Sequence, residues 1–71
     1  MNYTLMQRAG DVITVLGGLI AGNDEEAKVQ TAKLVRERLS DGSMEPSYLI
    51  ALSRPDGGAV VEMTAAEFAT L

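Results

Sequence analysis

The sequence predicts one α+β domain over residues 1–71: two N-terminal helices, then a β-hairpin, then a short C-terminal helix. Three observations lead to this prediction. Two apolar runs flank the turn sequence Arg54–Gly58, an apolar stripe at helical spacing occupies the first twenty residues, and a helix-capping pattern begins at Asn23. A chain this short buries only about 60% of the surface its unfolded form exposes, so we expect a single small core.

The segment from Leu5 to Ala21 is expected to form the first helix, with Thr4 as its N-cap. Apolar residues recur there at spacings of three and four, the period of a helix face. A second line of small residues would let another backbone approach closely. The apolar stripe comprises Leu5, Ala9, Val12, Leu16 and Leu19, and the small-residue line comprises Gly10, Thr14, Gly17 and Ala21.

Residues 12–21 of this segment also fit a β-hairpin that turns at Gly17–Gly18, because β-branched residues lie around this glycine pair. Two glycines inside a helix cost about 2 kcal/mol relative to alanine. However, the apolar runs do not alternate, and the helical stripe continues back to Leu5. We therefore favour the helix and keep the hairpin as the alternative.

A second helix is expected to begin at Asn23, which is a favourable N-cap and has Glu26 three residues on, as in a capping box. Acidic residues fill its first turn and basic residues lie near its end, and both arrangements suit the helix dipole. Gly42, after Asp41, supplies the stop. The charged residues concerned are Asp24, Glu25, Glu26, Arg36 and Arg38.

The hairpin spans Tyr48–Met63, and its turn chemistry allows two registers. A type I turn over Arg54–Gly57, with Gly57 as a bulge residue, sets Arg54 opposite Gly58 and Ala51 opposite Val61. A two-residue turn over Asp56–Gly57 shifts the pairing by one. The second register gives the cleaner apolar face, whereas turn chemistry favours the first, which we adopt. In the second register, the apolar face would hold Tyr48, Ile50, Leu52, Val61 and Met63.

After the hairpin, Thr64 and Glu67 form a capping box that opens a final short helix, with Phe68 and Leu71 expected to face the core. Pro46 keeps the connector before the hairpin extended. This order of elements predicts no parallel crossover between strands.

Composition excludes several classes of function. With ten acidic and six basic side chains the net charge is −4, which disfavours nucleic acid and anionic membranes as partners. The chain has no cysteine and no histidine, and we expect no metal and no cofactor. The longest apolar segment, Val12–Ala21, is far short of the roughly 20 residues of a membrane span, and no secretory leader is evident. We therefore expect a cytoplasmic protein.

No group of residues predicts catalysis. Asp24, Glu25 and Glu26 are consecutive on a helix, so their carboxylates fan around its axis instead of converging. Neither glycine pair has the pattern of a phosphate-binding loop or a following lysine. The sequence thus predicts a protein that is not an enzyme and has no catalytic residues.

DNA binding is the alternative function. A helix followed by a basic-tipped hairpin is the skeleton of a winged DNA reader, and its contacts would be Arg36, Arg38 and Arg54. Acidic residues are interleaved with these arginines. The stretch Tyr48–Leu71, a hairpin followed by T-x-x-E-F-x-x-L, resembles the corresponding part of Phd/YefM-type antitoxins. It covers a third of the chain, and that family's N-terminal pattern is lacking, so the resemblance implies only an alternative: a dimeric regulator.

The favoured hypothesis is a protein-interaction module. A hairpin with apolar residues on both faces cannot hide both behind two helices, and Tyr48–Ser53 has no charge or proline to protect an unpaired edge. We expect a homodimer, or a partner that supplies a strand, with a compact monomer as the alternative. The protein would act as an inhibitor, adaptor or accessory subunit, of the kind that phages and mobile elements use. Apolar contacts are expected from Tyr48, Leu49, Ile50 and Leu52, and acidic contacts from Glu25, Glu26, Glu37 and Asp41.

Overall fold

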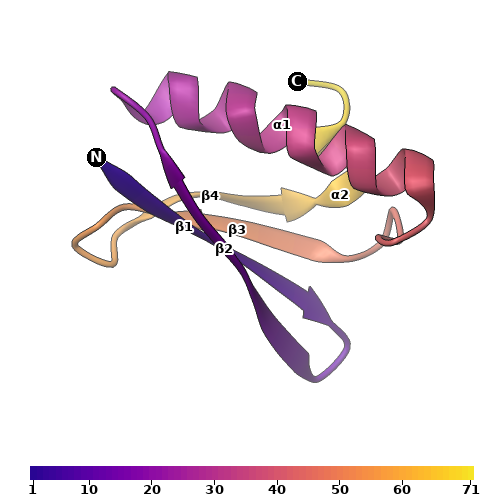
Figure 1. Cartoon of the computed structure of the whole chain (residues 1–71). Coiled ribbons are helices and arrows are strands. Elements are labelled where there is room, and N and C mark those ends of the chain that lie inside the picture. The colour runs from indigo at the N-terminus through magenta and orange to yellow at the C-terminus, as the bar shows by residue number, and fades with distance from the viewer.

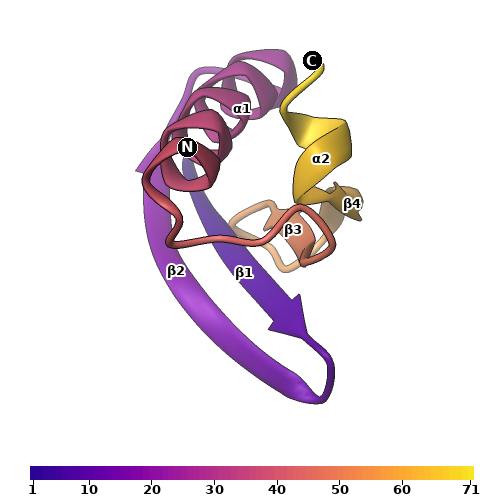
Figure 2. The ribbon, with the colours of Figure 1, turned by 90° about the vertical axis from the view of Figure 1, so that its right-hand side faces the viewer.

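The computed structural model describes residues 1–71 and consists of a four-stranded antiparallel sheet with both helices on one face (Figure 1). The sheet has the order β2-β1-β3-β4. Figure 2 shows α1 and α2 side by side above the strands, while the opposite face has no covering element. The elements are β1 (Asn2–Ala9), β2 (Val12–Ile20), α1 (Asp24–Asp41), β3 (Leu49–Ser53), β4 (Ala59–Thr64) and α2 (Ala65–Phe68).

The predicted first helix is wrong, because residues 5–20 belong to the β1–β2 hairpin. The chain reverses at Gly10–Asp11, where Gly10 has a φ of 62° and Ala9 pairs with Val12. A positive φ at the first central position is typical of a two-residue hairpin turn, and glycine adopts it without steric cost. Tyr3 and Leu5 are buried at alternate positions, as a strand requires. The apparent helical stripe is therefore a coincidence of spacing.

The alternative hairpin was right in type but wrong in place. Gly17 and Gly18 lie inside β2 instead of at a turn, and Gly17 has a φ of 137°. Leu5 pairs with Gly17 and Met6 with Val15, so Leu16 is an extra residue in the ladder and forms a β-bulge. Because the helix is absent, the predicted line of small residues has no meaning here.

The expectation of no parallel crossover is also wrong. β2 and β3 are both antiparallel to β1, which lies between them, so they are parallel to each other. α1 connects β2 to β3 across one face of the sheet, as a connection between parallel strands requires. This crossover places β1 and β3 in the centre of the sheet.

The helix that begins after Asn23 is confirmed. The Asn23 side chain accepts a hydrogen bond of 2.8 Å from the Glu26 backbone N–H, and Gly42 ends the helix with a φ of 81°. The helix faces the sheet with small residues and one valine, which allows close packing. Its buried residues are Ala27, Thr31, Ala32 and Val35.

The β3–β4 hairpin is confirmed, and its geometry combines both expected registers. Arg54 N–H donates to Gly58 O at 2.7 Å, and Gly57 has a φ of 90°, which confirms the expected type of turn with a glycine bulge. Beyond the turn, Leu52 pairs with Val61, so the register we adopted is wrong by one residue there. Val60 is the extra residue that absorbs the difference. The bulge allows the expected turn to form and still lets the apolar side chains Ile50 and Leu52 face the helices.

The short C-terminal helix and its capping box are confirmed. Thr64 Oγ1 accepts from Glu67 N–H at 3.2 Å, and Glu67 Oε1 accepts from Thr64 N–H at 3.1 Å. Phe68 is fully buried as expected, whereas Leu71 is 56% exposed. The core lies between the sheet and the two helices. Its largest fully buried side chains are Tyr3, Thr31, Val35, Ile50, Leu52 and Phe68. Neither helix could span a membrane, judged by length and apolar character together.

Candidate interaction surface

Strand β2 is the most exposed apolar element of the fold. It carries four of the seven large hydrophobic residues that are exposed, and these are 63–75% accessible. It contains no charged residue and no proline over nine residues. Soluble proteins normally protect an edge strand with charge, proline or a covering element, so an unprotected one marks a surface for association. The four residues are Val12, Ile13, Val15 and Ile20.

The free edge of β2 also presents unpaired backbone groups. Met1 and Ala21 exchange two hydrogen bonds, of 2.9 and 3.1 Å, so the odd-numbered residues of β1 direct their N–H and C=O groups toward β2. Met6 therefore directs its backbone N–H and C=O groups toward β3. Its partner Val15 directs its own backbone groups away from β1, toward the free edge. The same alternation applies to Ile13, which pairs with Arg8. Ile13 and Val15 thus offer hydrogen bonds to an added strand.

The opposite edge of the sheet, β4, is protected. It has six residues, carries Glu62 in its middle and is irregular at the Val60 bulge. Its chain continues directly into α2, which packs against α1. These are recognised devices against edge-to-edge pairing. Of the two sheet edges, β2 is the one open to a partner.

The uncovered face of the sheet continues the apolar surface of β2. Tyr3 and Leu5 face the helices, so their neighbours Thr4 and Met6 face the other way. Across the strands, one row of this face is Val15, Met6, Ala51 and Glu62, and the next is Ile13, Arg8, Leu49 and Thr64. We call the apolar members of these rows the outer strip: Met6, Ile13, Val15, Leu49 and Ala51.

The four residues predicted to make apolar contacts lie on β3 or just before it. Ile50 and Leu52 have no exposed surface, because β3 is central and these side chains face the helices. The premise that Tyr48–Ser53 is an unpaired edge is therefore wrong. Tyr48 and Leu49 are partly buried, and only Leu49 belongs to the outer strip. Reasoning from the sequence missed Ile13 and Val15. The signal that could have found them is the β-branched run V-I-T-V.

The predicted acidic contacts all lie on α1, at its two ends. Glu25 forms an ion pair of 2.8 Å with Lys28, and Glu26 accepts a hydrogen bond from Gln30 Nε2 at 3.4 Å. Asp41 Oδ1 accepts from Ser43 N–H at 2.8 Å, and hydrogen bonding by the side chain and then the backbone of Ser43 lowers the pKa of this carboxyl. Glu37 is exposed. These carboxylates all lie on α1 and form no single cluster. Glu26 lies near the end of β2, because Gln30 Nε2 also donates to Ile20 O at 3.0 Å.

The three arginines of the DNA-binding alternative lie in three different places. Arg36 Nη1 donates to the carbonyls of Ala69 and Leu71, at 3.5 and 3.3 Å. Arg38 lies in the last turn of α1 and is partly buried. Arg54 is neutralised by Asp24 at 2.7 Å. The arginines therefore form no shared basic surface for a phosphate backbone.

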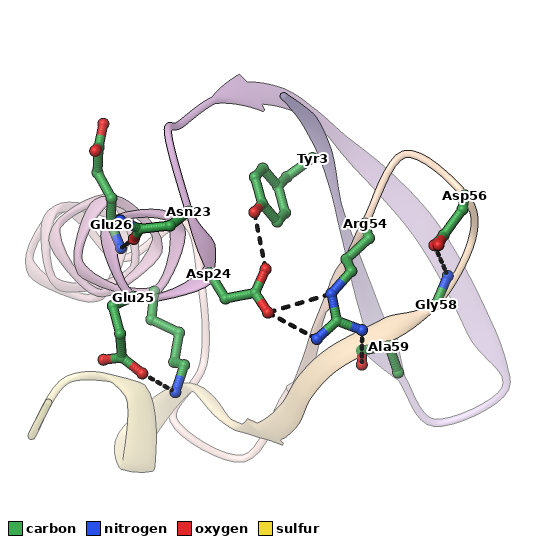
Figure 3. A network of polar contacts seen from close by, with 10 residues as sticks. Tyr3, Asn23, Asp24, Glu25, Glu26, Arg54, Asp56, Gly58 and Ala59 are labelled. Carbon is green, nitrogen blue, oxygen red and sulfur yellow. Dashed lines mark hydrogen bonds and ion pairs between the residues drawn. The ribbon is translucent and has the colours of Figure 1, made fainter.

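A polar network joins three elements of the fold (Figure 3). Asp24, at the start of α1, accepts a hydrogen bond of 2.8 Å from the Tyr3 hydroxyl on β1. Its other oxygen accepts two bonds from the Arg54 guanidinium, at 2.7 and 3.2 Å. Arg54 Nη1 also donates to Ala59 O at 3.5 Å. The network fastens the start of α1 to β1 and to the β3–β4 turn.

We call the network of Tyr3, Asp24 and Arg54 the clamp, and its hydrogen bonds shift the pKa values of its groups. The bonds from Arg54 and Tyr3 lower the pKa of Asp24, and burial together with Asp24 raises the pKa of Tyr3. Near neutral pH the Asp24 carboxylate therefore stays ionised and the Tyr3 phenol stays neutral. The hollow beside the clamp, of about 510 Å³, is open to solvent and is lined by Met1, Asn23, Asp24, Glu25 and Arg54.

Comparison of the chain with models of protein families, with curated proteins and with solved structures found no match. The proposals that follow therefore rest on the geometry of this chain.

Proposed function

We propose that the protein is a non-enzymatic protein-interaction module that binds its partner through β2 and the outer strip. The observation that carries this proposal is the 63–75% exposure of four large apolar residues on one uncharged strand. Covering such a surface with a partner is favourable, by roughly 25 cal/mol for each Å² of apolar area removed from water. The free backbone groups of Ile13 and Val15 add directional hydrogen bonds to this attraction.

The distribution of charge supports the same mode of binding. The acidic residues Glu25, Glu26 and Glu37 lie on α1, which covers the other face of the sheet. A partner can thus approach the outer strip without desolvating these carboxylates, whose burial would be costly. Arg8 is the one charged residue between Ile13 and Leu49 on the outer face, and it would suit an acidic group at the rim of the interface. The partner we propose has an apolar strand or ridge.

The role of such a module would be to occupy a surface of another protein, as an inhibitor, adaptor or accessory subunit. A small chain with an exposed apolar strand can block or bridge other proteins. The lowered pKa of Asp24 and the raised pKa of Tyr3 move both groups away from proton exchange near neutral pH. A cytoplasmic location belongs to the same proposal, and fractionation of cells that express the chain tests it.

Selection of peptides from a random display library tests the proposed surface directly. Val15 and Val29 are a matched pair, because both are valines with 63% and 65% exposure, one on β2 and one on α1. We expect the wild-type chain and Val29→Lys to capture apolar, β-branched peptides, and Val15→Lys to lose them. Capture of the same peptides by Val15→Lys, or selection of no peptide at all, would contradict the proposal.

A further inference from the structure

We infer that β2 pairs antiparallel with β2 of a second copy, centred on Thr14, so that two sheets join into one of eight strands. This inference rests on the proposed function, since it names the occupant of the same strand. Antiparallel self-pairing generates a two-fold axis, the commonest symmetry of homo-oligomers. With the axis perpendicular to the sheet, both copies keep their helices on one face and their outer strips on the other.

The hydrogen-bonding pattern of β2 permits this register. Ile13 and Val15 direct their backbone groups to the free edge, and both lie in the regular part of the strand, before the bulge at Leu16. Centring on Thr14 sets Ile13 of one copy opposite Val15 of the other, twice, so that all four residues exchange hydrogen bonds. Thr14 of one copy then lies directly opposite Thr14 of the other in a close pair, and threonine pairs are favourable across antiparallel strands.

The shape of the hairpin makes a second copy the fitting occupant. In this register the turn residues Gly10 and Asp11 of one copy lie beside Gly18 and Gly17 of the other, at equal distances along the chain from Thr14. All four residues are exposed, and a Cβ built on Gly17 meets nothing within 4 Å. The protruding tip of one hairpin thus meets the stretch of its partner that has no side chains. An unrelated strand would have no reason to match this pattern.

The charge and size of the interface set the expected affinity. The chain carries a net charge of −4, but β2 itself holds no carboxylate, and the Asp11 residues of the two copies lie at opposite ends of the interface. Nine residues of strand extend about 30 Å. An interface of one strand pair is at the small end of specific interfaces, so we expect dissociation in the micromolar range. Dimerisation also doubles the outer strip, because Ile13 and Val15 of both copies become neighbours.

Charge substitution at Thr14 tests both the interface and its register. Thr14 is exposed, so a charge there leaves the folded monomer intact. In the dimer, Thr14→Lys places two ammonium groups directly opposite each other, and Thr14→Glu places two carboxylates there, so each variant should dimerise at least about tenfold more weakly. A mixture of the two variants should recover dimers, because opposite charges then face each other. Thr14→Val, which is β-branched and uncharged, is the control that keeps the dimer.

Sedimentation equilibrium of these four chains and of the mixture, across the micromolar range, gives the result. A monomeric wild type at all concentrations overturns the inference, and so does a dimer that neither charge weakens or that the mixture fails to restore. These outcomes leave the peptide selection with Val15→Lys unaffected, so failure of self-pairing is distinguishable from failure of the proposed function.

Discussion

The placement of β3 at the centre and β2 at the edge can be tested with two isoleucines that differ in environment and not in chemistry. Ile50 lies on β3 and has no exposed surface, whereas Ile13 lies on β2 and is 65% exposed. The same substitution, Ile→Ala, removes the same atoms and the same strand preference at both sites. Any difference in effect therefore reports burial.

The expected magnitudes follow from the two environments. Ile50→Ala deletes side-chain atoms from the core between the sheet and the helices, which costs about 2–5 kcal/mol including the cavity. A domain of this length has a free energy of unfolding of roughly 4–10 kcal/mol, so the variant loses a large part of its stability. Ile13→Ala loses only strand preference and partial contacts, at most about 1 kcal/mol.

Urea and thermal unfolding of dilute protein, followed by circular dichroism, measure both variants. Each kcal/mol corresponds to a shift of about 4–8 °C in Tm for a domain of this size. We expect Ile50→Ala to unfold far below the wild type and Ile13→Ala to stay close to it. Equal losses at the two sites would refute the reasoning, because β2 would then be packed against part of its own chain.

Three further predictions concern the ends of elements and the clamp. Asn23→Ala should cost about 1 kcal/mol in urea unfolding, because it removes the cap on α1, whereas Asn23→Ser should be nearly neutral. Gly57→Ala should cost about 1–2 kcal/mol, since φ is 90° there; no loss would mean a different turn. The lowered pKa of Asp24 predicts that its contribution to stability is complete above its ordinary pKa of 3.8 and is lost as the pH falls through the lower folded value. Asp24→Asn should flatten this acid limb of the stability profile, and an unchanged limb would show that the clamp is open in solution.

The N-terminal hairpin shows where prediction from the sequence fails. Leu5, Val12 and Leu16 fit a helical stripe, yet the buried residues of β1, Tyr3 and Leu5, follow a period of two. The sequence of β2 does not alternate between apolar and polar residues, because neither face of this strand is well covered. No buried face therefore requires apolar residues at every second position. The turn was signalled by Gly10–Asp11, a pair that the helical interpretation treated as interior residues. Patterning predicts a strand only where one face meets a core.

Signals in the sequence were reliable where the structure depends on contacts between residues that are close in the sequence. Asn23 with Glu26, and Thr64 with Glu67, predicted both helix starts, because capping depends on neighbours within three residues. The β3–β4 turn was likewise predicted from Pro55 to Gly58. The register was not, because the conflict between turn chemistry and apolar pattern is solved by a bulge, which neither signal alone contains.

The candidate surface moved from one strand to another for a topological reason. An uncharged strand is either the centre of a sheet or an unprotected edge, and the sequence alone does not distinguish the two. Tyr48–Ser53 is uncharged because it is central, and Val12–Ile20 is uncharged at an edge. The helix crossover, which inserts β1 beside β3, decides between them. That long-range pairing has no local signature.

Residue-resolved hydrogen exchange, measured from dilute to concentrated protein, tests the central claim most directly. We predict that the amides of Ile50 and Leu52 exchange slowly at every concentration, because both residues are buried and pair with residues of β4. The amides of Ile13 and Val15 should exchange rapidly in dilute protein and become protected as β2 finds its partner. Slow exchange at Ile13 and Val15 in the dilute monomer would contradict the account, since the edge that we assign to association would already be occupied.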